Sequence, residues 1–430
     1  MFQGQLTPKT LVALGVSHHR AAVNIRERLY LATDQAIELA RPLTEGDGEA
    51  VVLSTCNRTE VYLAGYDGDT AVANARSSLA ALSGLSDREL EPFLEQLEGE
   101  DVVAHLFRVA AGLDSLVEGE PQILGQVRDA YRAARSARFT GRILNRLFAH
   151  ALHTGKRVRS ETAIGDVASS VALAAAELAD RLLGDLANRH VLVIGAGKMS
   201  ELTTASLMAR GAGTVFVANH RIERAERLVR RFGGRAVHFD TIPSELERAD
   251  IVISSTRCPR PILTAADVKP VLPRRAGRPL VFIDVAVPRD LDPAIGQLDG
   301  CSLYDIDSVG DAHGDSRNGR GEAVVGAERI AAEEAARFAE WQRSLEVVPA
   351  IAALRRRAEE IRLAELARRE GRLRALSEPE REAVDIITTQ IVNKLLHVPT
   401  VRLKEAVRDP HARPYAEALR HLFALEERER

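Results

Sequence analysis

The stretch from residue 165 to residue 310 alternates short apolar runs with helix-length segments, and this alternation constrains the fold more than any other feature. Strands that alternate with helices form parallel sheets, because the return to the same edge of the sheet needs a crossover connection. We therefore predict a parallel, doubly wound sheet in the middle of the chain. Its six candidate strands are 190–195, 214–219, 235–239, 250–256, 280–287 and 301–307.

The first of these runs ends in a glycine-rich turn that opens a helix. Glycine in this position permits a tight turn and a close approach to a pyrophosphate, which the N–H groups of the helix N-terminus bind. Ser200, a small residue, stands where the pattern usually has its last glycine. An ordinary strand-to-helix turn is the alternative. The candidate cofactor-binding residues are Gly195, Ala196, Gly197, Lys198, Met199 and Ser200.

The end of the second strand distinguishes the two nicotinamide cofactors. An NAD site places Asp or Glu there to hold the ribose 2′-hydroxyl. This chain has Asn219, His220 and Arg221, with Arg224 one helical turn further. A cationic side chain suits a 2′-phosphate, so we favour NADP(H). In the alternative, these basic residues only begin a solvated helix.

The N-terminal region mixes predicted strands at 11–16, 50–55 and 61–66 with a helical pattern from Glu100 onward. Cys56 follows the second of these strands and lies two residues before Arg58. A nearby positive charge lowers the pKa of a thiol, and the thiolate is the nucleophile. A small buried hydrophobic residue is an equally weighted alternative. Cys258 and Cys301 are better interpreted as structural residues.

Overall charge and cysteine content exclude several classes of protein. The 58 basic and 61 acidic residues leave a formal net charge of −3, so a polycationic nucleic-acid coat is excluded. Three separated cysteines without a CxxC pair argue against a disulfide framework and a structural zinc site. We expect no bound metal. Without a signal-peptide pattern or an apolar run of about 18 residues, a cytoplasmic location is expected.

Two further regions carry polar or charged side chains. The block from His105 to Gln126 sets Ser, Glu and Gln side chains in an apolar frame, which suits a small polar ligand or two solvated helices. Arginines recur every three or four residues and form a basic stripe on one face of a predicted helical stretch. This stretch is either one continuous helix or two helices separated at Gly141. The stripe is either a nucleic-acid contact or a solvated face. The stripe consists of Arg128, Arg132, Arg135, Arg138, Arg142 and Arg146.

Beyond a Gly-rich, charged linker at 313–322, the chain becomes rich in Ala, Glu, Arg and Leu with helical spacing. Long amphipathic helices of mixed charge have solvated faces and one apolar stripe. We favour a helical dimerisation domain over a helical cap on the same chain.

Taken together, these motifs resemble the glutamyl-tRNA reductases over nearly the whole chain. The most specific blocks are LSTCNRTEVY (53–62) and GEPQILGQ (119–126). Further matches are GVSHHRAAVNIRERL (15–29), GAGKM (195–199), IDVAVPRDLDP (283–293), YDID (304–307) and TTQIVNKLLHVPTVRLKE (388–405). Ser200 and the His-Arg pair after Asn219 depart from the family pattern, and both departures lie at the predicted nucleotide site.

The resemblance implies an α/β multi-domain fold. It has an N-terminal α+β catalytic domain (1–163), a Rossmann-type NADPH domain (164–312) and a C-terminal all-α dimerisation domain (313–430) on a long spinal helix. In this family, the cysteine corresponding to Cys56 attacks the ester of glutamyl-tRNA(Glu), and NADPH reduces the resulting thioester to glutamate-1-semialdehyde for tetrapyrrole synthesis. His105 matches an activity-sensitive histidine. The implied substrate pocket is Thr55, Asn57, Arg58, Ser115, Glu120, Pro121, Gln122 and Gln126.

By the same resemblance, the chain is a V-shaped homodimer that binds tRNA and transiently docks the aminomutase acting on its product. Arg58 is the expected ligand of the substrate's side-chain carboxylate. Two alternatives of other classes remain: a Rossmann dehydrogenase for a free small molecule, and a non-catalytic tRNA-binding scaffold.

Overall fold

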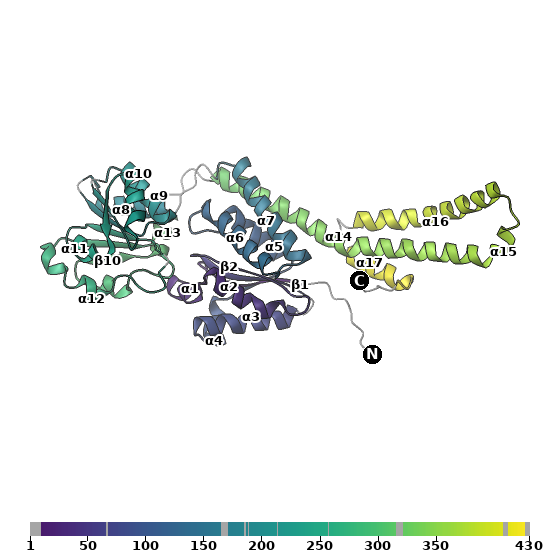
Figure 1. The fold of residues 1–430 in the computed structure, drawn as a ribbon, viewed down its shortest axis with the longest axis horizontal. Helices are drawn as coiled ribbons and strands as arrows, with labels where there is room; N and C mark the ends of the chain where they lie inside the picture. Colours follow the sequence, from purple (N-terminus) through teal and green to yellow (C-terminus); the bar gives the residue numbers. More distant parts are fainter. Residues whose placement is uncertain are drawn as a thin grey trace. The chain divides into compact units, whose positions relative to one another are not determined.

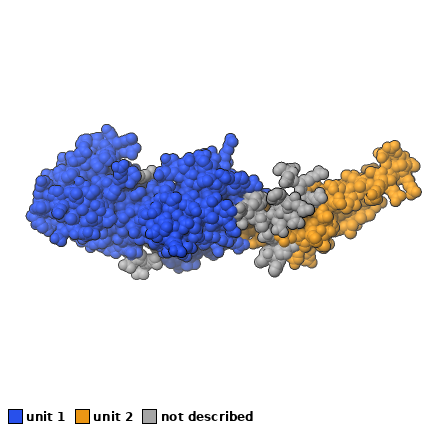
Figure 2. Space-filling view, turned by 90° about the horizontal axis from the view of Figure 1, so that it is seen from below, with its two compact units in different colours: residues 1–334 blue, residues 335–430 orange. Residues whose placement is uncertain are grey.

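The computed structural model describes residues 10–65, 68–164, 171–184, 186–187, 189–212, 214–256, 258–314, 321–406 and 412–425. The chain forms two compact units, residues 1–334 and 335–430 (Figure 2). Unit 1 contains two sheets, one in the N-terminal part (residues 10–164) and one in the central part (residues 171–314). Among the described helices, none is both long and apolar enough to cross a membrane. Most of the predicted linker, 315–320, lies outside the described residues.

The N-terminal sheet has four antiparallel strands in the order β2-β3-β1-β4. The three predicted strands are confirmed, although residue 66 is not described. The sequence prediction missed β4, because its residues EQLE are polar and lie at the sheet edge. The strands are β1 (Thr10–Ser17), β2 (Glu49–Ser54), β3 (Arg58–Gly65) and β4 (Glu95–Glu98). Helices α1 (Val23–Leu29), α2 (Thr33–Ala40), α3 (Gly68–Ser83) and α4 (Asp87–Leu90) accompany the sheet (Figure 1).

Three longer helices follow: α5 (Glu100–Ala111), α6 (Gln122–Ser136) and α7 (Arg142–Glu161). Glu49, which is buried, accepts N–H groups from Gly141, Ile143 and Leu144 at 2.9, 3.2 and 2.7 Å. This carboxylate satisfies donors that the first turn of α7 would leave unpaired. The basic stripe is therefore divided between α6, α7 and their connection, which contains Arg138, and its six arginines are exposed.

The central sheet confirms the six predicted strands, all parallel, in the order β10-β9-β8-β5-β6-β7. This is the doubly wound order, which changes direction beside β5. The strands are β5 (His190–Ile194), β6 (Thr214–Asn219), β7 (Arg235–His238), β8 (Ile251–Ser254), β9 (Leu280–Asp284) and β10 (Cys301–Tyr304). Apolar residues of each central strand alternate between two core clusters, so both faces of the sheet are buried.

Six helices accompany these strands: α8 (Val171–Leu183), α9 (Lys198–Ala209), α10 (Ile222–Phe232), α11 (Ile242–Leu246), α12 (Ala265–Val268) and α13 (Ile306–Gly314). Short 3₁₀ turns occur at Arg41–Thr44, Glu91–Phe93, Phe239–Thr241, Leu272–Arg275 and Pro293–Gln297.

The predicted long helix is α14 (Gly321–Arg368). Its first turns pack on the N-terminal part, where Ala327, Ile330 and Ala331 form a cluster with Ala111 and Val158. Unit 2 continues with α15 (Glu370–Leu373), α16 (Glu378–Ala406) and α17 (Ala412–Leu422). Its small core consists of Ala350, Ile351, Leu354, Leu403 and Leu419. The helical character of the C-terminal region is thus confirmed.

Candidate active site

Cys56 lies in a tight turn between β2 and β3. Thr55 fixes the turn, because its Oγ1 accepts the N–H groups of Asn57 and Arg58 at 3.1 and 3.2 Å. Cys56 itself is half-buried and packs against a large apolar cluster, as do Ala196 and Met199 of the glycine turn. This cluster joins Val23 and Val117 of the N-terminal part to the central sheet and its helices. The structure therefore brings the predicted nucleophile and the predicted cofactor turn to the same cluster.

The thiol of Cys56 does not have the lowered pKa that its neighbouring arginine suggested. Burial, together with the negative charge of Glu120, raises the pKa of Cys56 to about 12. Arg26 and Arg58 act in the opposite direction but do not compensate. The reason is that Arg58 is already paired with two carboxylates: Nη1 lies 2.9 Å from Glu60 and Nη2 lies 2.8 Å from Asp114.

Arg58 is the centre of a buried ionic network, with only 1% of its surface exposed. His105 Nε2 lies 2.9 Å from Glu60 Oε1, and the hydroxyl of Tyr62 donates to Glu60 Oε2 at 2.6 Å. Burial opposes ionisation of Glu60, but His105 and Arg58 outweigh it and lower the pKa of Glu60 to about 2. Burial also lowers the pKa of His105, yet the charge of Glu60 leaves it raised overall.

The groups with which Arg58 was expected to bind the substrate carboxylate already belong to this network. Both of its terminal nitrogens are engaged, and Asp114 also accepts from Nη2 through its backbone oxygen. Within the described residues, Nε of Arg58 is buried without a hydrogen-bond partner. A substrate carboxylate at this site would approach Nε or displace Glu60 or Asp114.

Several residues near Cys56 were not predicted from the sequence. His19 Nε2 lies 2.8 Å from Asp114 Oδ1, and burial with the charges of His19 and Arg58 lowers the pKa of His18 to about 3. Arg26, also buried, donates from Nε to the carbonyl oxygen of Cys56 at 3.2 Å. The available signal was the Ser-His-His run that directly ends the apolar strand β1.

The residues of the 115–126 block reach the same region. Ser115 and Glu120 are buried, and burial raises the pKa of Glu120 to about 7 while Arg159 partly offsets it. Gln122 Nε2 donates to Met199 Sδ at 3.3 Å, which joins a predicted substrate residue to a predicted cofactor residue. Pro121 is exposed and Gln126 is half-buried.

The glycine turn fits a dinucleotide pyrophosphate. Gly195 has a φ of +114°, and a Cβ there would lie 2.8 Å from Ser200 Oγ and 3.0 Å from the backbone oxygen of Ser255. A Cβ on Gly197 would meet open space, directly before the first turn of α9. Ser200 is fully buried and its Oγ lies 2.8 Å from Ser255 Oγ, so it closes the turn where a third glycine usually packs.

The edge of the turn beyond β6 carries the predicted specificity residues. Asn219 Oδ1 accepts the backbone N–H of Arg221 at 2.9 Å. The ring of His220 stacks on Phe239 with centroids 3.7 Å apart. His220 and Arg221 are exposed, so their side chains border solvent where the adenosine half of a dinucleotide would lie.

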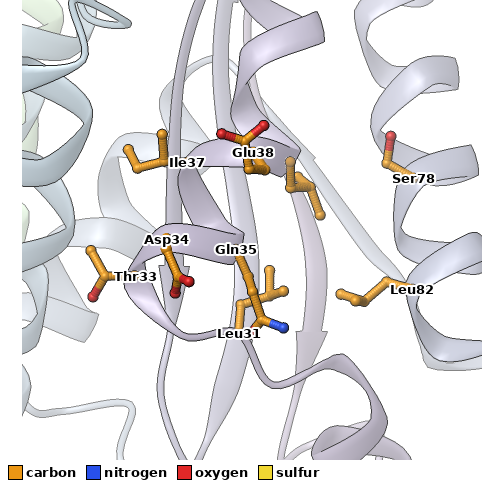
Figure 3. Close-up of a pocket in the computed structure, with 9 residues that line it drawn as sticks. Leu31, Thr33, Asp34, Gln35, Ile37, Glu38, Ser78 and Leu82 are labelled. Carbon is orange, nitrogen blue, oxygen red and sulfur yellow. The ribbon is translucent and has the colours of Figure 1, made fainter.

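An open groove between α2 and α3 is a separate feature of the N-terminal part (Figure 3). Leu31, Ile37, Glu38, Ser78 and Leu82 are among its lining residues. None of the predicted site residues lines it, so the groove contributes nothing to the Cys56 site.

A doubly wound nucleotide-binding sheet beside a strand-end cysteine defines a class of dinucleotide-dependent oxidoreductases with a thiol at the reacting centre. Family models match three segments: the N-terminal domain of glutamyl-tRNAGlu reductase over residues 14–162, shikimate/quinate 5-dehydrogenase over 177–311, and the dimerisation domain of glutamyl-tRNAGlu reductase over 326–425. The chain belongs to the glutamyl-tRNA reductase family.

Similar proteins cover the chain almost completely. The glutamyl-tRNA reductase of Syntrophotalea carbinolica is 43% identical over 416 residues, 96% of this chain and 94% of the relative. That of Geobacter sulfurreducens is 42% identical over 418 residues, covering 97% and 96%. The solved glutamyl-tRNA reductase of Methanopyrus kandleri is 32% identical, covers 96% of this chain and 99% of its own, and has a TM-score of 0.47.

Proposed function

We propose that this chain reduces glutamyl-tRNA(Glu) to glutamate-1-semialdehyde, the first committed step of tetrapyrrole synthesis, with NADPH as reductant and Cys56 as the acyl carrier. The observation that carries the proposal is the packing of Cys56 against the same cluster as the glycine turn. A cysteine so placed accepts an acyl group and then lies beside the dinucleotide site. The reaction is the one for which the relatives, glutamyl-tRNA reductases, are named.

In the first step, Sγ of Cys56 bonds to the carbonyl carbon of the ester, and the bond to the 3′-oxygen of the tRNA breaks. The thiol proton leaves by way of a base and ends on that 3′-oxygen. Glu120 suits this exchange, because a carboxylate with a pKa of about 7 accepts and returns a proton near neutral pH. His105, held by Glu60, is the second proton-exchanging group of the site.

In the second step, the thioester carbonyl is reduced and the bond to Sγ breaks, which releases the aldehyde and a thiolate. The thiolate takes up a proton from solvent by way of Glu120, and this restores the thiol. Bound NADPH supplies the hydride. Within the chain, Gly195, Ala196, Gly197, Lys198, Met199 and Ser200 would hold the pyrophosphate, as the turn geometry supports. Asn219, His220 and Arg221 would receive the 2′-phosphate, because no acidic side chain occupies the end of β6.

The remaining site residues keep their proposed substrate role. Arg58 would bind the side-chain carboxylate of the glutamyl group. Glu120 would accept a hydrogen bond from the α-ammonium of the same group before it takes part in proton exchange. The turn residues Thr55 and Asn57 are buried beside Cys56, which supports a role in shaping the pocket. Ser115, Pro121, Gln122 and Gln126 complete the proposed pocket.

Unit 2 supports a homodimer. Helix α16 exposes an apolar row at every third or fourth position, which its own small core does not use. Such a row on a helix is the pattern of a helix–helix seam. The row is Ile387, Ile391, Leu395 and Val398, which are 52–70% exposed. We propose that a second copy of the chain covers it, and we retain domain limits of 1–163, 164–312 and 313–430.

The exposed arginines of α6 and α7 support a tRNA contact. Replacing Arg132, Arg135 and Arg142 by Glu should raise the KM for glutamyl-tRNA at least about tenfold and leave NADPH affinity unchanged, because each reversal replaces an attraction to phosphate by a repulsion. Unchanged tRNA binding at moderate salt would make the stripe a solvated face. We also retain transient docking of the aminomutase and a reducing, cytoplasmic setting, which the three free cysteines support.

The decisive experiment compares the wild type with Cys56→Ser. With glutamyl-tRNA and NADPH, the serine variant should lose reduction by at least about a thousandfold, since a serine hydroxyl is not activated here. Without NADPH, the wild type should accumulate an acyl-enzyme on Cys56, detected by mass spectrometry. Reduction by Cys56→Ser would refute the mechanism. Reduction of a free small molecule would favour a plain dehydrogenase, and tRNA binding without turnover would favour a scaffold.

A further inference from the structure

Helix α1 of the N-terminal part binds the central part through Arg26. The guanidinium of Arg26 lies 2.7 Å from Oδ1 and 3.2 Å from Oδ2 of Asp307, which belongs to α13. Asp307 Oδ2 also accepts the backbone N–H of Val23 at 2.9 Å. Because Nε of the same arginine donates to the carbonyl oxygen of Cys56, one buried side chain contacts both the Cys56 turn and the central part.

The next residue of α1 makes a second bridge. The carboxylate of Glu27 accepts three hydrogen bonds from Arg289: from Nε at 3.0 Å, from Nη2 at 2.5 Å and from the backbone N–H at 3.1 Å. Both side chains are about four-fifths buried, with 20% and 19% of their surface exposed. A bidentate, partly buried pair is stronger than an ordinary surface ion pair.

Arg289 belongs to a loop that also supports the dinucleotide edge of the central sheet. Its neighbour Asp290 is buried and accepts the hydroxyl groups of Ser254 and Thr256 at 2.6 and 2.5 Å, and the N–H of Thr256 at 2.7 Å. These residues flank Ser255, whose side chain meets Ser200 of the glycine turn. The Glu27–Arg289 pair therefore ends on the loop that frames the turn.

The two half-reactions place opposite demands on this interface. Acyl transfer requires the 3′ end of a tRNA to reach Sγ of Cys56, whereas reduction requires the dinucleotide turn to lie over it. The contacts that α1 makes with the central part, next to the Cys56 turn, satisfy only the second demand. Figure 1 shows α1 at the side of the N-terminal sheet that faces the central part, where a reversible contact would control access.

We propose that the pairs Arg26–Asp307 and Glu27–Arg289, together the α1 latch, hold the central part docked over Cys56 during reduction. The two pairs break when the central part moves away for acyl transfer. The inference rests on the proposed function, because it assigns the two states to its two half-reactions. Its positioning residues are Glu27 and Arg289, which among the described residues form hydrogen bonds with each other but not with Cys56 or the glycine turn.

The test uses the full-length protein and three separate measurements on Glu27→Gln. The first is the rate at which iodoacetamide alkylates Cys56 without any substrate, followed by mass spectrometry of the Cys56 peptide. The second is acyl-enzyme formation from glutamyl-tRNA without NADPH. The third is reduction of the preformed acyl-enzyme after NADPH is added. Arg274→Gln is the matched control, because it breaks an ion pair with Glu247 within the central part, 2.6 Å long and remote from α1 in sequence.

The latch predicts that Glu27→Gln is alkylated at Cys56 about tenfold faster and reduces its acyl-enzyme about tenfold more slowly, while acyl-enzyme formation is equal or faster. The charge swap Glu27→Arg with Arg289→Glu should recover at least part of both changes, and Arg274→Gln should match the wild type. Unchanged alkylation and reduction in Glu27→Gln would overturn the latch, as would an equal loss of both half-reactions. A wild type that forms no acyl-enzyme would instead refute the proposed function, which the alkylation measurement does not depend on.

Discussion

The Cys56 region and the cofactor edge of the central sheet use charge in opposite ways. Around Cys56, charged groups are buried and paired with one another: Arg58 with Glu60 and Asp114, and His105 with Glu60. At the end of β6, His220 and Arg221 are exposed, and Arg221 forms no ion pair among the described residues. Buried pairs fix the shape of a pocket, whereas exposed cations are free to bind an incoming anion.

The largest effect should come from breaking the buried network. Arg58→Met leaves Glu60 and Asp114 without their shared cation, so the free energy of unfolding should fall by about 3 to 5 kcal/mol. Urea unfolding at pH 7 measures this change. In the same experiment, Arg221→Met removes an equal charge from the exposed edge and should alter stability by less than about 0.5 kcal/mol. Similar losses in both variants would contradict the contrast between the two regions.

The second effect depends on pH and concerns Glu120. Its pKa in the folded chain is raised from 4.5 to about 7, so the folded state holds the proton more tightly than the unfolded state. The contribution of Glu120 to the free energy of unfolding is therefore fully present below pH 4.5 and is lost as the pH rises through 7. Glu120→Gln should match the wild type at pH 4.5 and be more stable by roughly 3 kcal/mol at pH 8.

Urea unfolding at the two pH values provides the check for Glu120. Glu118→Gln, two residues earlier in the chain, is the control for removing a carboxylate from the same segment. A stability difference between Glu120→Gln and the wild type that does not vary with pH would show that Glu120 is ionised in the folded chain across this range.

These two regions also differ in how far the sequence predicted them. The central sheet and the strand-to-helix position of the glycine turn were predicted correctly, because each depends on a local pattern of apolar runs and glycines. The pairing of Arg58 with Asp114, 56 residues apart, depends on the packing of β3 against the segment after α5. No local pattern encodes that contact, so the sequence suggested a lowered pKa for Cys56 and gave no sign that Arg58 is already paired.

Long-range contacts explain the other omissions as well. Arg26 and Glu27 lie in a segment that the resemblance covers, yet their partners Asp307 and Arg289 are more than 260 residues away. The basic stripe was predicted with the right residues, but its division into α6 and α7 depends on Glu49, which comes from β2. In each case the residue type was visible in the sequence and the partner was not.

The smallest effect tests the exposed edge alone. Arg221→Glu should weaken NADPH binding about tenfold, or about 1.4 kcal/mol, and leave NADH binding nearly unchanged, because only NADPH carries the 2′-phosphate that the new carboxylate repels. Fluorescence titration of the full-length chain with each cofactor measures both affinities without any turnover.

Arg227→Glu is the control, because it makes the same charge change at an exposed position further along α10. Residue 227 lies about 9 Å along the helix axis from residue 221, so this variant should alter NADPH binding much less. An equal loss in both variants would show that the cofactor senses the net charge of the helix rather than a contact at Arg221. An equal loss for NADH and NADPH would place the 2′-phosphate elsewhere, and His220, stacked on Phe239, would be the next side chain to replace.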